Sequence, residues 1–254
     1  MRRRLSPFGG AVLFLLCIFL VGCSKELVRP GQSDREMFDL GKRLMEQEEY
    51  QDAITVFREL NNRHPSSPLV EEALFNIALA YYLDEMDVDA EVAFDDFLRL
   101  YPASPLVPKA LLYKGLTIER AVEPPGRDQD PAREALSVYR DLVARYPDAE
   151  EARKGRERIE ALRSHLARHE MEIARFYIKK DKFDAAVYRL RRALESYGDT
   201  RVGDDLKLLL GIALARSGKL EEARKILHEL ERSESPPEGI GDLREEIRER
   251  EAEK

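Results

Sequence analysis

Residues 66–83 read SSPLVEEALFNIALAYYL, and residues 103–120 read ASPLVPKALLYKGLTIER. The two stretches share a Ser-Pro-Leu-Val string whose serines, Ser67 and Ser104, lie 37 residues apart. Serine is a favoured N-cap and proline is favoured at the first helical position, so each string predicts the start of a helix. A period of this length is typical of arrays of helical hairpins.

The tetratricopeptide pattern tests this interpretation, because it requires a small residue at position 8 and an alanine at position 20 of each repeat. Small residues there allow two antiparallel helices to pack closely, and a large apolar residue at position 24 fills the neighbouring space. We therefore predict an all-α fold, a tetratricopeptide-repeat α-solenoid of about five helical hairpins. The matching residues are Gly41, Ala78, Gly115, Ala174 and Gly211 at position 8; Ala53, Ala90, Ala135, Ala186 and Ala223 at position 20; and Phe57, Phe94, Tyr139, Leu190 and Leu227 at position 24.

The repeats are unevenly spaced. An insertion at residues 121–131, rich in proline, predicts a loop inside repeat 3. Residues 149–180 contain no proline, and their apolar residues recur at steps of three and four, which predicts a long helix of about 48 Å connecting repeats 3 and 4. We expect repeats 1–3 in residues 34–148, the long helix with repeats 4 and 5 in residues 149–235, and a charged C-terminal tail in residues 236–254, either a solvated helix or a frayed end.

The N-terminus carries an export signal. Three arginines precede an apolar run from Ala11 to Val21, which is too short to cross a membrane as a helix and is typical of a secretory leader. The string Leu20-Val21-Gly22-Cys23 resembles the lipobox of bacterial lipoproteins. That resemblance implies a signal peptide over residues 1–22, cleavage before Cys23, and S-diacylglycerol and N-acyl groups on Cys23. Residues 23–33 would form a flexible tether, and Ser24 in place of aspartate favours the outer membrane.

Composition excludes several classes of function. The net charge is −7, and it falls to −10 once the three leader arginines are removed, so the chain is a poor candidate for binding nucleic acid. The only other cysteine, Cys17, lies in the leader, so the mature chain has no disulfide.

His165 and His169 could share a metal by spacing, but they lie in the apolar seam of the long helix without an HExxH motif, and we expect them to pack against neighbouring residues. We predict no catalytic residues, no metal, no cofactor other than the covalent lipid, and no small-molecule substrate.

The first helix of each N-terminal repeat presents residues to a groove. Counting positions 5 and 12 as groove-facing predicts an apolar and aromatic surface with scattered cations, suited to extended peptides with aromatic side chains. The alternative is that some of these residues are buried against the neighbouring helix. The candidates are Phe38, Lys42, Met45, Phe75, Asn76, Tyr82 and Tyr113.

A lipobox followed by five such repeats resembles the BamD family of outer-membrane assembly lipoproteins. The stretches that carry the resemblance are residues 78–116, 128–147 and 169–200, and it extends from about Asp34 to Glu231. It implies a non-enzymatic, lipid-anchored scaffold of the β-barrel assembly (BAM) complex at the periplasmic face of the outer membrane. Its implied partners are the POTRA region of BamA, other BAM lipoproteins and unfolded barrel precursors. For the BamA contact we expect a basic face in repeat 4, whose alternative is a solvated surface: Lys182, Arg189, Arg191 and Arg192.

Two other classes share some of these features. A type IV pilus-assembly lipoprotein (pilotin) would also combine a lipobox with repeats, but without the irregular spacing. A Tol-Pal-associated periplasmic repeat adaptor would normally lack the lipobox and carry an N-terminal coiled coil.

Overall fold

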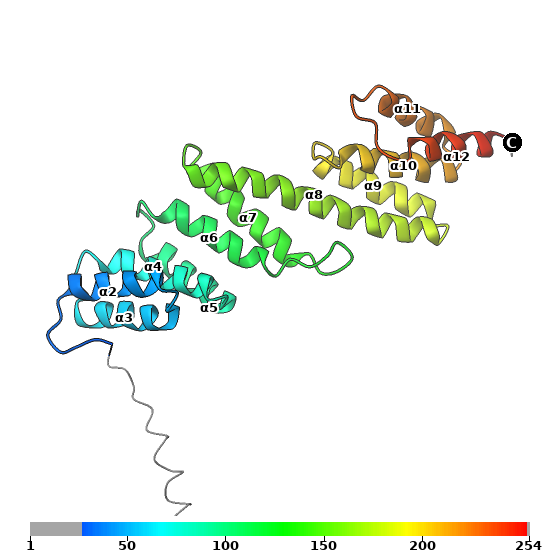
Figure 1. Ribbon diagram of the computed structural model, residues 1–254. Coiled ribbons are helices and arrows are strands. Elements are labelled where there is room, and N and C mark those ends of the chain that lie inside the picture. Colours follow the sequence, from blue (N-terminus) through cyan, green and yellow to red (C-terminus); the bar gives the residue numbers. More distant parts are fainter. Residues whose placement is uncertain (1–26, 253–254) are drawn as a thin grey trace, which may run out of the picture.

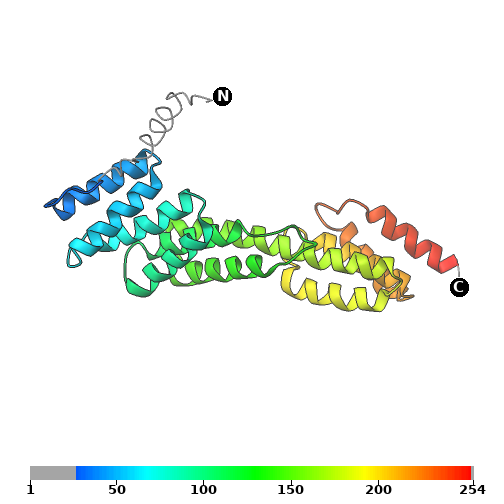
Figure 2. The same ribbon diagram turned by 90° about the horizontal axis from the view of Figure 1, so that it is seen from below.

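The computed structural model describes residues 27–252, and all its regular secondary structure is α-helical. The leader, residues 1–22, and Cys23 lie outside the described residues. Figures 1 and 2 show an elongated array in which successive helices stack side by side. The helices are α2 (Asp34–Glu46), α3 (Tyr50–Arg63), α4 (Val70–Leu83), α5 (Asp87–Leu100), α6 (Val107–Glu119), α7 (Asp130–Arg145), α8 (Glu150–Lys179), α9 (Phe183–Tyr197), α10 (Gly203–Arg216), α11 (Leu220–Glu231) and α12 (Ile240–Ala252).

The tetratricopeptide solenoid is confirmed. Its hairpins are α2–α3, α4–α5, α6–α7, the C-terminal half of α8 with α9, and α10–α11. The five position-20 alanines are all fully buried. In α2, Gly41 lies directly under the ring of Phe57 from α3, so that a Cβ on Gly41 would sit 2.5 Å from Phe57 Cε1. In repeat 1 the two helices thus meet where one of them has no side chain.

The two serines that begin the Ser-Pro-Leu-Val strings do not cap helices directly. Helices α4 and α6 start three residues later, and the Ser67 and Ser104 hydroxyls accept from the backbone N–H of Leu69 and Leu106 in a preceding turn. Each hydroxyl also donates to an acidic residue in the first turn of the preceding repeat, Ser67 to Asp34 Oδ2 at 2.6 Å and Ser104 to Glu71 Oε1. The motif therefore joins neighbouring repeats.

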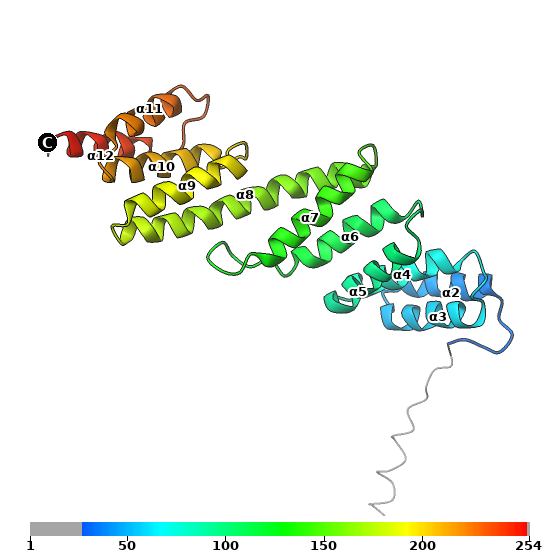
Figure 3. The ribbon, with the colours of Figure 1, turned by 180° about the vertical axis from the view of Figure 1, so that it is seen from behind.

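The long helix is confirmed as α8, whose 30 residues give a length of about 45 Å. It is more than a connector, because each half belongs to a different core. Residues up to Leu166 pack with α6 and α7, whereas residues from Ala167 onward pack with α9, α10 and α11. Figure 3 shows α8 running from the α6–α7 hairpin to the α9–α10 end of the array.

The insertion forms the predicted loop, and the two histidines of α8 hold it. Gln129 is buried and donates from Nε2 to the carbonyls of Pro124 and Arg127 at 3.0 and 3.2 Å. Its Oε1 accepts from His165 Nε2 at 2.6 Å, and His169 Nδ1 bonds to the Pro125 carbonyl. The histidines thus fix the loop along α8.

The tail differs from the prediction of a solvated helix or frayed end. Residues 240–252 form α12, which packs on α10 and α11. Leu243 is fully buried and Ile247 nearly so, and Leu243 lies over Gly211 of α10. Ile240 also packs against this core, and Glu246 pairs with Arg216 of α10 at 2.8 Å, so α12 covers the last hairpin.

The expected tether is also partly folded. Val28 is buried in the core of repeat 1, with Leu27 half-buried beside it. The Gln32 carbonyl bonds to His64 Nε2 at 3.2 Å, and Arg63 NH1 donates to the Arg29 carbonyl at 3.3 Å. Residues 27–33 therefore lie against the end of α3.

Replacing Gly41 by alanine tests the close approach of α2 and α3. The added Cβ would push against the rigid Phe57 ring, so we expect the free energy of unfolding to fall by about 1–3 kcal/mol. Gly241→Ala is the matched control, because a Cβ there meets nothing within 4 Å in α12 and alanine favours helix. Urea unfolding of the mature chain measures both. A Gly41→Ala protein as stable as the control would contradict the packing.

His165 gives the fold a pH dependence. Burial lowers the pKa of His165 below its usual value, and Arg168 and His169 add repulsion. The unfolded chain, with a histidine pKa of about 6.5, then binds the proton more readily than the folded chain. Stability is therefore full above about pH 6.5 and declines below it. Unfolding at about pH 7.5 and 5.5 should show a smaller pH dependence in His165→Gln than in the wild type. An unchanged dependence in His165→Gln would exclude this residue as its source.

Candidate protein-binding site

The hairpin formed by α8 and α9 has a flank that the preceding hairpin does not cover. In a solenoid of this kind each hairpin covers a flank of the next one. Here α7 packs on the N-terminal half of α8, where Leu142 and Val143 contact Gly155. The C-terminal half of α8, which pairs with α9, lies beyond it.

A hollow of about 430 Å³ lies on that uncovered side, between α8 and α9. One stripe of α9 supplies most of its lining, because the contributing residues recur at steps of three and four. Tyr188, one of these lining residues, is 65% exposed. We call the lining residues the open flank: Glu170, Tyr177, Ala185, Tyr188, Arg189, Arg192, Ala193, Ser196 and Tyr197.

The two arginines of the open flank differ in their pairing. Arg189 NH1 donates to Glu170 Oε2 at 2.5 Å, and both side chains are mostly buried. Arg192, one turn along the stripe from Tyr188, is exposed and makes no ion pair with any described residue. The surface therefore offers an aromatic ring beside a cation that is available to a partner's carboxylate.

The other two predicted basic residues lie elsewhere. Arg191 points to the next hairpin and pairs with Glu222 of α11. Lys182 precedes α9 and lines a separate hollow with Arg216 and Ser217. Of the four predicted basic residues, the fold thus brings only Arg189 and Arg192 together.

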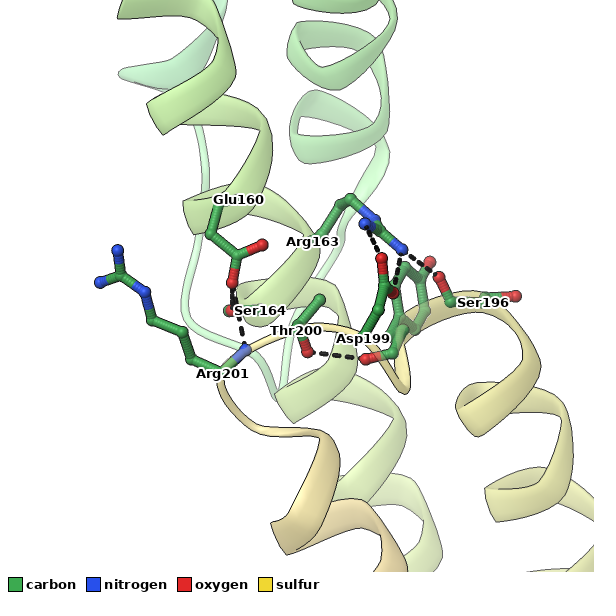
Figure 4. Close-up of polar contacts among 8 residues, drawn as sticks. Glu160, Arg163, Ser164, Ser196, Asp199, Thr200 and Arg201 are labelled. Carbon is green, nitrogen blue, oxygen red and sulfur yellow. Dashed lines mark hydrogen bonds and ion pairs between the residues drawn. The ribbon is translucent and has the colours of Figure 1, made fainter. Parts of the chain in front are cut away.

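A polar cluster fixes the end of α9 on α8 (Figure 4). Arg163 binds both carboxylate oxygens of Asp199, at 2.8 and 2.6 Å, and the Ser196 carbonyl at 2.7 Å. The guanidinium lowers the pKa of the Asp199 carboxyl below its usual range. Glu160 Oε1 accepts from the backbone N–H of Arg201 at 3.1 Å. These bonds hold the α9–α10 turn, and with it the end of the open flank at Ser196 and Tyr197.

The structure places three of the predicted groove residues in the core. Phe38 packs against Phe57 with ring centroids 5.8 Å apart, and Phe75 makes an edge contact with Phe97 at 5.6 Å. Asn76 is buried, donates to the Glu72 carbonyl at 2.8 Å and accepts from Lys42 at 3.4 Å. These three side chains are therefore buried and do not face a groove, as the alternative interpretation stated.

The remaining groove candidates stay partly accessible. Tyr82 and Tyr113 form an edge contact at 5.1 Å, and the Arg120 guanidinium lies 4.0 Å from the centre of the Tyr82 ring. Lys42 and Met45 of α2 are half-buried. They leave a smaller surface than the sequence predicted, with one cation, Arg120, that the sequence did not single out.

Seven of the nine residues of the open flank, all except Arg189 and Arg192, were missed from the sequence, and Tyr188, Tyr177 and Glu170 are the most informative of them. Tyr188 is four residues before Arg192, which places both on one face of a helix, so this spacing was a usable signal. Tyr177 and Glu170 come from α8, and their exposure depends on how far along α8 the α6–α7 hairpin packs. That extent could not be read from local sequence.

Two further kinds of site were sought in residues 27–252. Histidine, cysteine and carboxylate side chains there nowhere form a group of three or more that could hold a metal ion. No helix in the same range has the length and hydropathy needed to cross a bilayer.

Comparisons with known proteins find relatives over most of the chain. The YfiO family, described as "Outer membrane lipoprotein", matches residues 30–228. "Outer membrane protein assembly factor BamD" of Caulobacter vibrioides is 27% identical over 216 residues, covering 83% of this chain and 71% of that protein. The same-named protein of Neisseria meningitidis serogroup B is 29% identical, covering 67% of each chain. That of Pasteurella multocida is 26% identical, covering 78% of this chain and 80% of that one.

Solved structures also resemble the chain. The TPR2AB domain of yeast Sti1 aligns with a TM-score of 0.46 at 16% identity, covering 77% of this chain and 75% of that one. PilW, a type IV pilus biogenesis factor, aligns with a TM-score of 0.36 at 15% identity, covering 84% of this chain and 98% of that one.

Proposed function

Because the chain belongs to the YfiO family of outer membrane lipoproteins, we propose that it is a non-enzymatic scaffold of the machinery that assembles β-barrel proteins in the outer membrane. The assembly role is supported by relatives named as BamD assembly factors that align over two thirds or more of this chain. Its helical repeats offer surfaces for polypeptides, as a scaffold needs.

The open flank is our proposed site for BamA, through its periplasmic POTRA region. The observation that carries this assignment is the missing neighbour: α8 extends past α7, so a hairpin flank that combines aromatic rings with charged and polar side chains faces outward where another hairpin would normally cover it. A partner that inserts an apolar side chain beside Tyr188 and offers a carboxylate to Arg192 would complete it.

Unfolded barrel precursors would bind the N-terminal repeats. The half-buried rings of Tyr82 and Tyr113, with Arg120 over Tyr82 and paired with Asp87, suit an extended segment that ends in an aromatic residue and a carboxylate, and Lys42 and Met45 of α2 remain partly accessible on the preceding hairpin. The aromatic side chain of such a segment would pack against the tyrosine rings, and its terminal carboxylate would bind the cation.

The lipid groups on Cys23 would keep this scaffold at the periplasmic face of the outer membrane. One acyl chain binds a membrane only weakly, and two membrane-binding groups are enough for stable anchoring. Three acyl chains on Cys23 would therefore hold the protein on the membrane without a membrane-spanning helix. Other BAM lipoproteins would join the same assembly.

Charge reversal at Arg192 tests the BamA site. Arg192→Glu removes the available cation and should reduce BamA co-purified from detergent-solubilised outer membranes about tenfold, corresponding to about 1.4 kcal/mol. Arg191→Glu is the matched control, since Arg191 adjoins it in sequence but pairs with Glu222 away from the flank. Equal loss in both variants, or in neither, would reject the open flank as the site.

The anchor has its own test. Cys23→Ala removes the thiol to which diacylglycerol would be attached, so metabolic labelling with a radioactive fatty acid should disappear while the helical circular dichroism of the purified chain is kept. Labelling that persists in Cys23→Ala would exclude Cys23 as the lipid site. Membrane association is the weaker readout, because BamA could still retain the variant.

A further inference from the structure

The segment before α2 is part of the repeat 1 core. Val28 is only 5% exposed, and Leu27 packs beside it. The turn that follows is closed by a bond from Arg29 N to Gln32 Oε1 at 2.7 Å, and Ser33 caps α2 reciprocally with Glu36. Figure 1 shows this segment lying along repeat 1 before α2 begins. The chain is therefore attached to the fold from Leu27 onward.

The distance from Cys23 to that attachment is short. Four peptide units separate Cys23 from Leu27, and they span at most about 14 Å when fully extended. An acylated cysteine lies at the boundary between hydrocarbon and headgroups, and the headgroup layer is about 5–8 Å thick on each side. After the chain has crossed the headgroup layer, at most about 6–9 Å of its length remains between the headgroups and Leu27. A free tether of ten residues would have reached about 35 Å.

We propose that one end of repeat 1 lies against the phospholipid headgroups of the membrane. This rests on the proposed lipid attachment at Cys23. The contacting surface, which we call the anchor end, comprises Arg29, Arg35, Asn62, Arg63 and Pro65. Because α2 and α3 are antiparallel, the start of α2 and the end of α3 lie at the same end of the hairpin, and the contacts of Gln32 and Asp34 with His64 and Ser67 join them there.

The chemistry of the anchor end fits headgroups and not the hydrocarbon. All five of its residues are exposed, and three are arginines, whose guanidinium groups bind phosphate well. Arg35 forms an exposed ion pair with Asp39, and Arg63 forms one with Glu59. Exposed pairs of this kind contribute little stability, so a headgroup phosphate can replace the carboxylate at little cost in free energy. Among described residues, the exposed large apolar side chains all lie in α4, α5, α8 and α9 and the α4–α5 turn, none at the anchor end. The surface would thus rest on the membrane without inserting.

Site-specific fluorescence tests the contact. The acylated mature chain has no free thiol, so a single introduced cysteine can be labelled with an environment-sensitive probe. Asn62→Cys places the probe at the anchor end, and Gln47→Cys places it at the opposite end of the same hairpin, about 20 Å away along the helices. Vesicles of phosphatidylethanolamine and phosphatidylglycerol containing a headgroup-attached spin label supply the quencher.

We expect quenching at residue 62 to exceed quenching at residue 47 several-fold. A flexible Gly-Ser insertion of about 12 residues between Lys25 and Glu26, which adds about 20 Å of mean reach, should abolish the difference while the protein still floats with the vesicles. Vesicle-bound protein with equal quenching at both sites, or with quenching that survives the insertion, would overturn the proposal. Failure to float would instead refute the lipid anchor itself.

Discussion

The close approach of two antiparallel helices at a small residue, glycine or alanine, is the constraint on which this structure depends. Gly41 beneath Phe57 shows it in repeat 1, and Gly115 beneath Tyr139 repeats it in repeat 3. When two helices pack in this way, the aromatic ring between them is buried, but the two flanks of the hairpin remain apolar. The next hairpin therefore stacks on one of these flanks. The elongation of the array and the stacking of successive helices follow from that local contact.

The array departs from this regularity at α8, and the departure creates its most distinctive surface. A single helix serves two cores, one with α6 and α7 and one with α9 to α11. The hairpin after the junction therefore begins without a covering neighbour. The loop that Gln129, His165 and His169 hold along α8 does not fill the gap at Tyr188. Irregularity in the spacing of the repeats thus leaves one flank of the α8–α9 hairpin uncovered.

Much of this was predictable from the sequence because its signals are local or periodic. The small residues at position 8, the buried alanines at position 20 and the unbroken run that became α8 depend on residues close together in the chain. Groove positions were less predictable, since whether Phe38 or Phe75 faces outward depends on how far the next helix rotates over it. The docking of α12 required Gly211 to leave room for Leu243, a contact between residues 32 apart. The open flank required knowing that the α6–α7 hairpin packs against α8 only as far as about residue 166.

The continuity of α8 also limits how chains of this kind can change length. Inserting one residue in the middle of the helix would rotate everything after it by about 100° and advance it by about 1.5 Å. The α9 stripe would then point away from its former direction, although both cores could still fold. An insertion of seven residues, close to two full turns, would restore the direction to within about 20° and lengthen the span by about 10 Å. Natural variants of this helix should therefore differ by near-whole turns, whereas the loop at residues 121–129 is free of that rule.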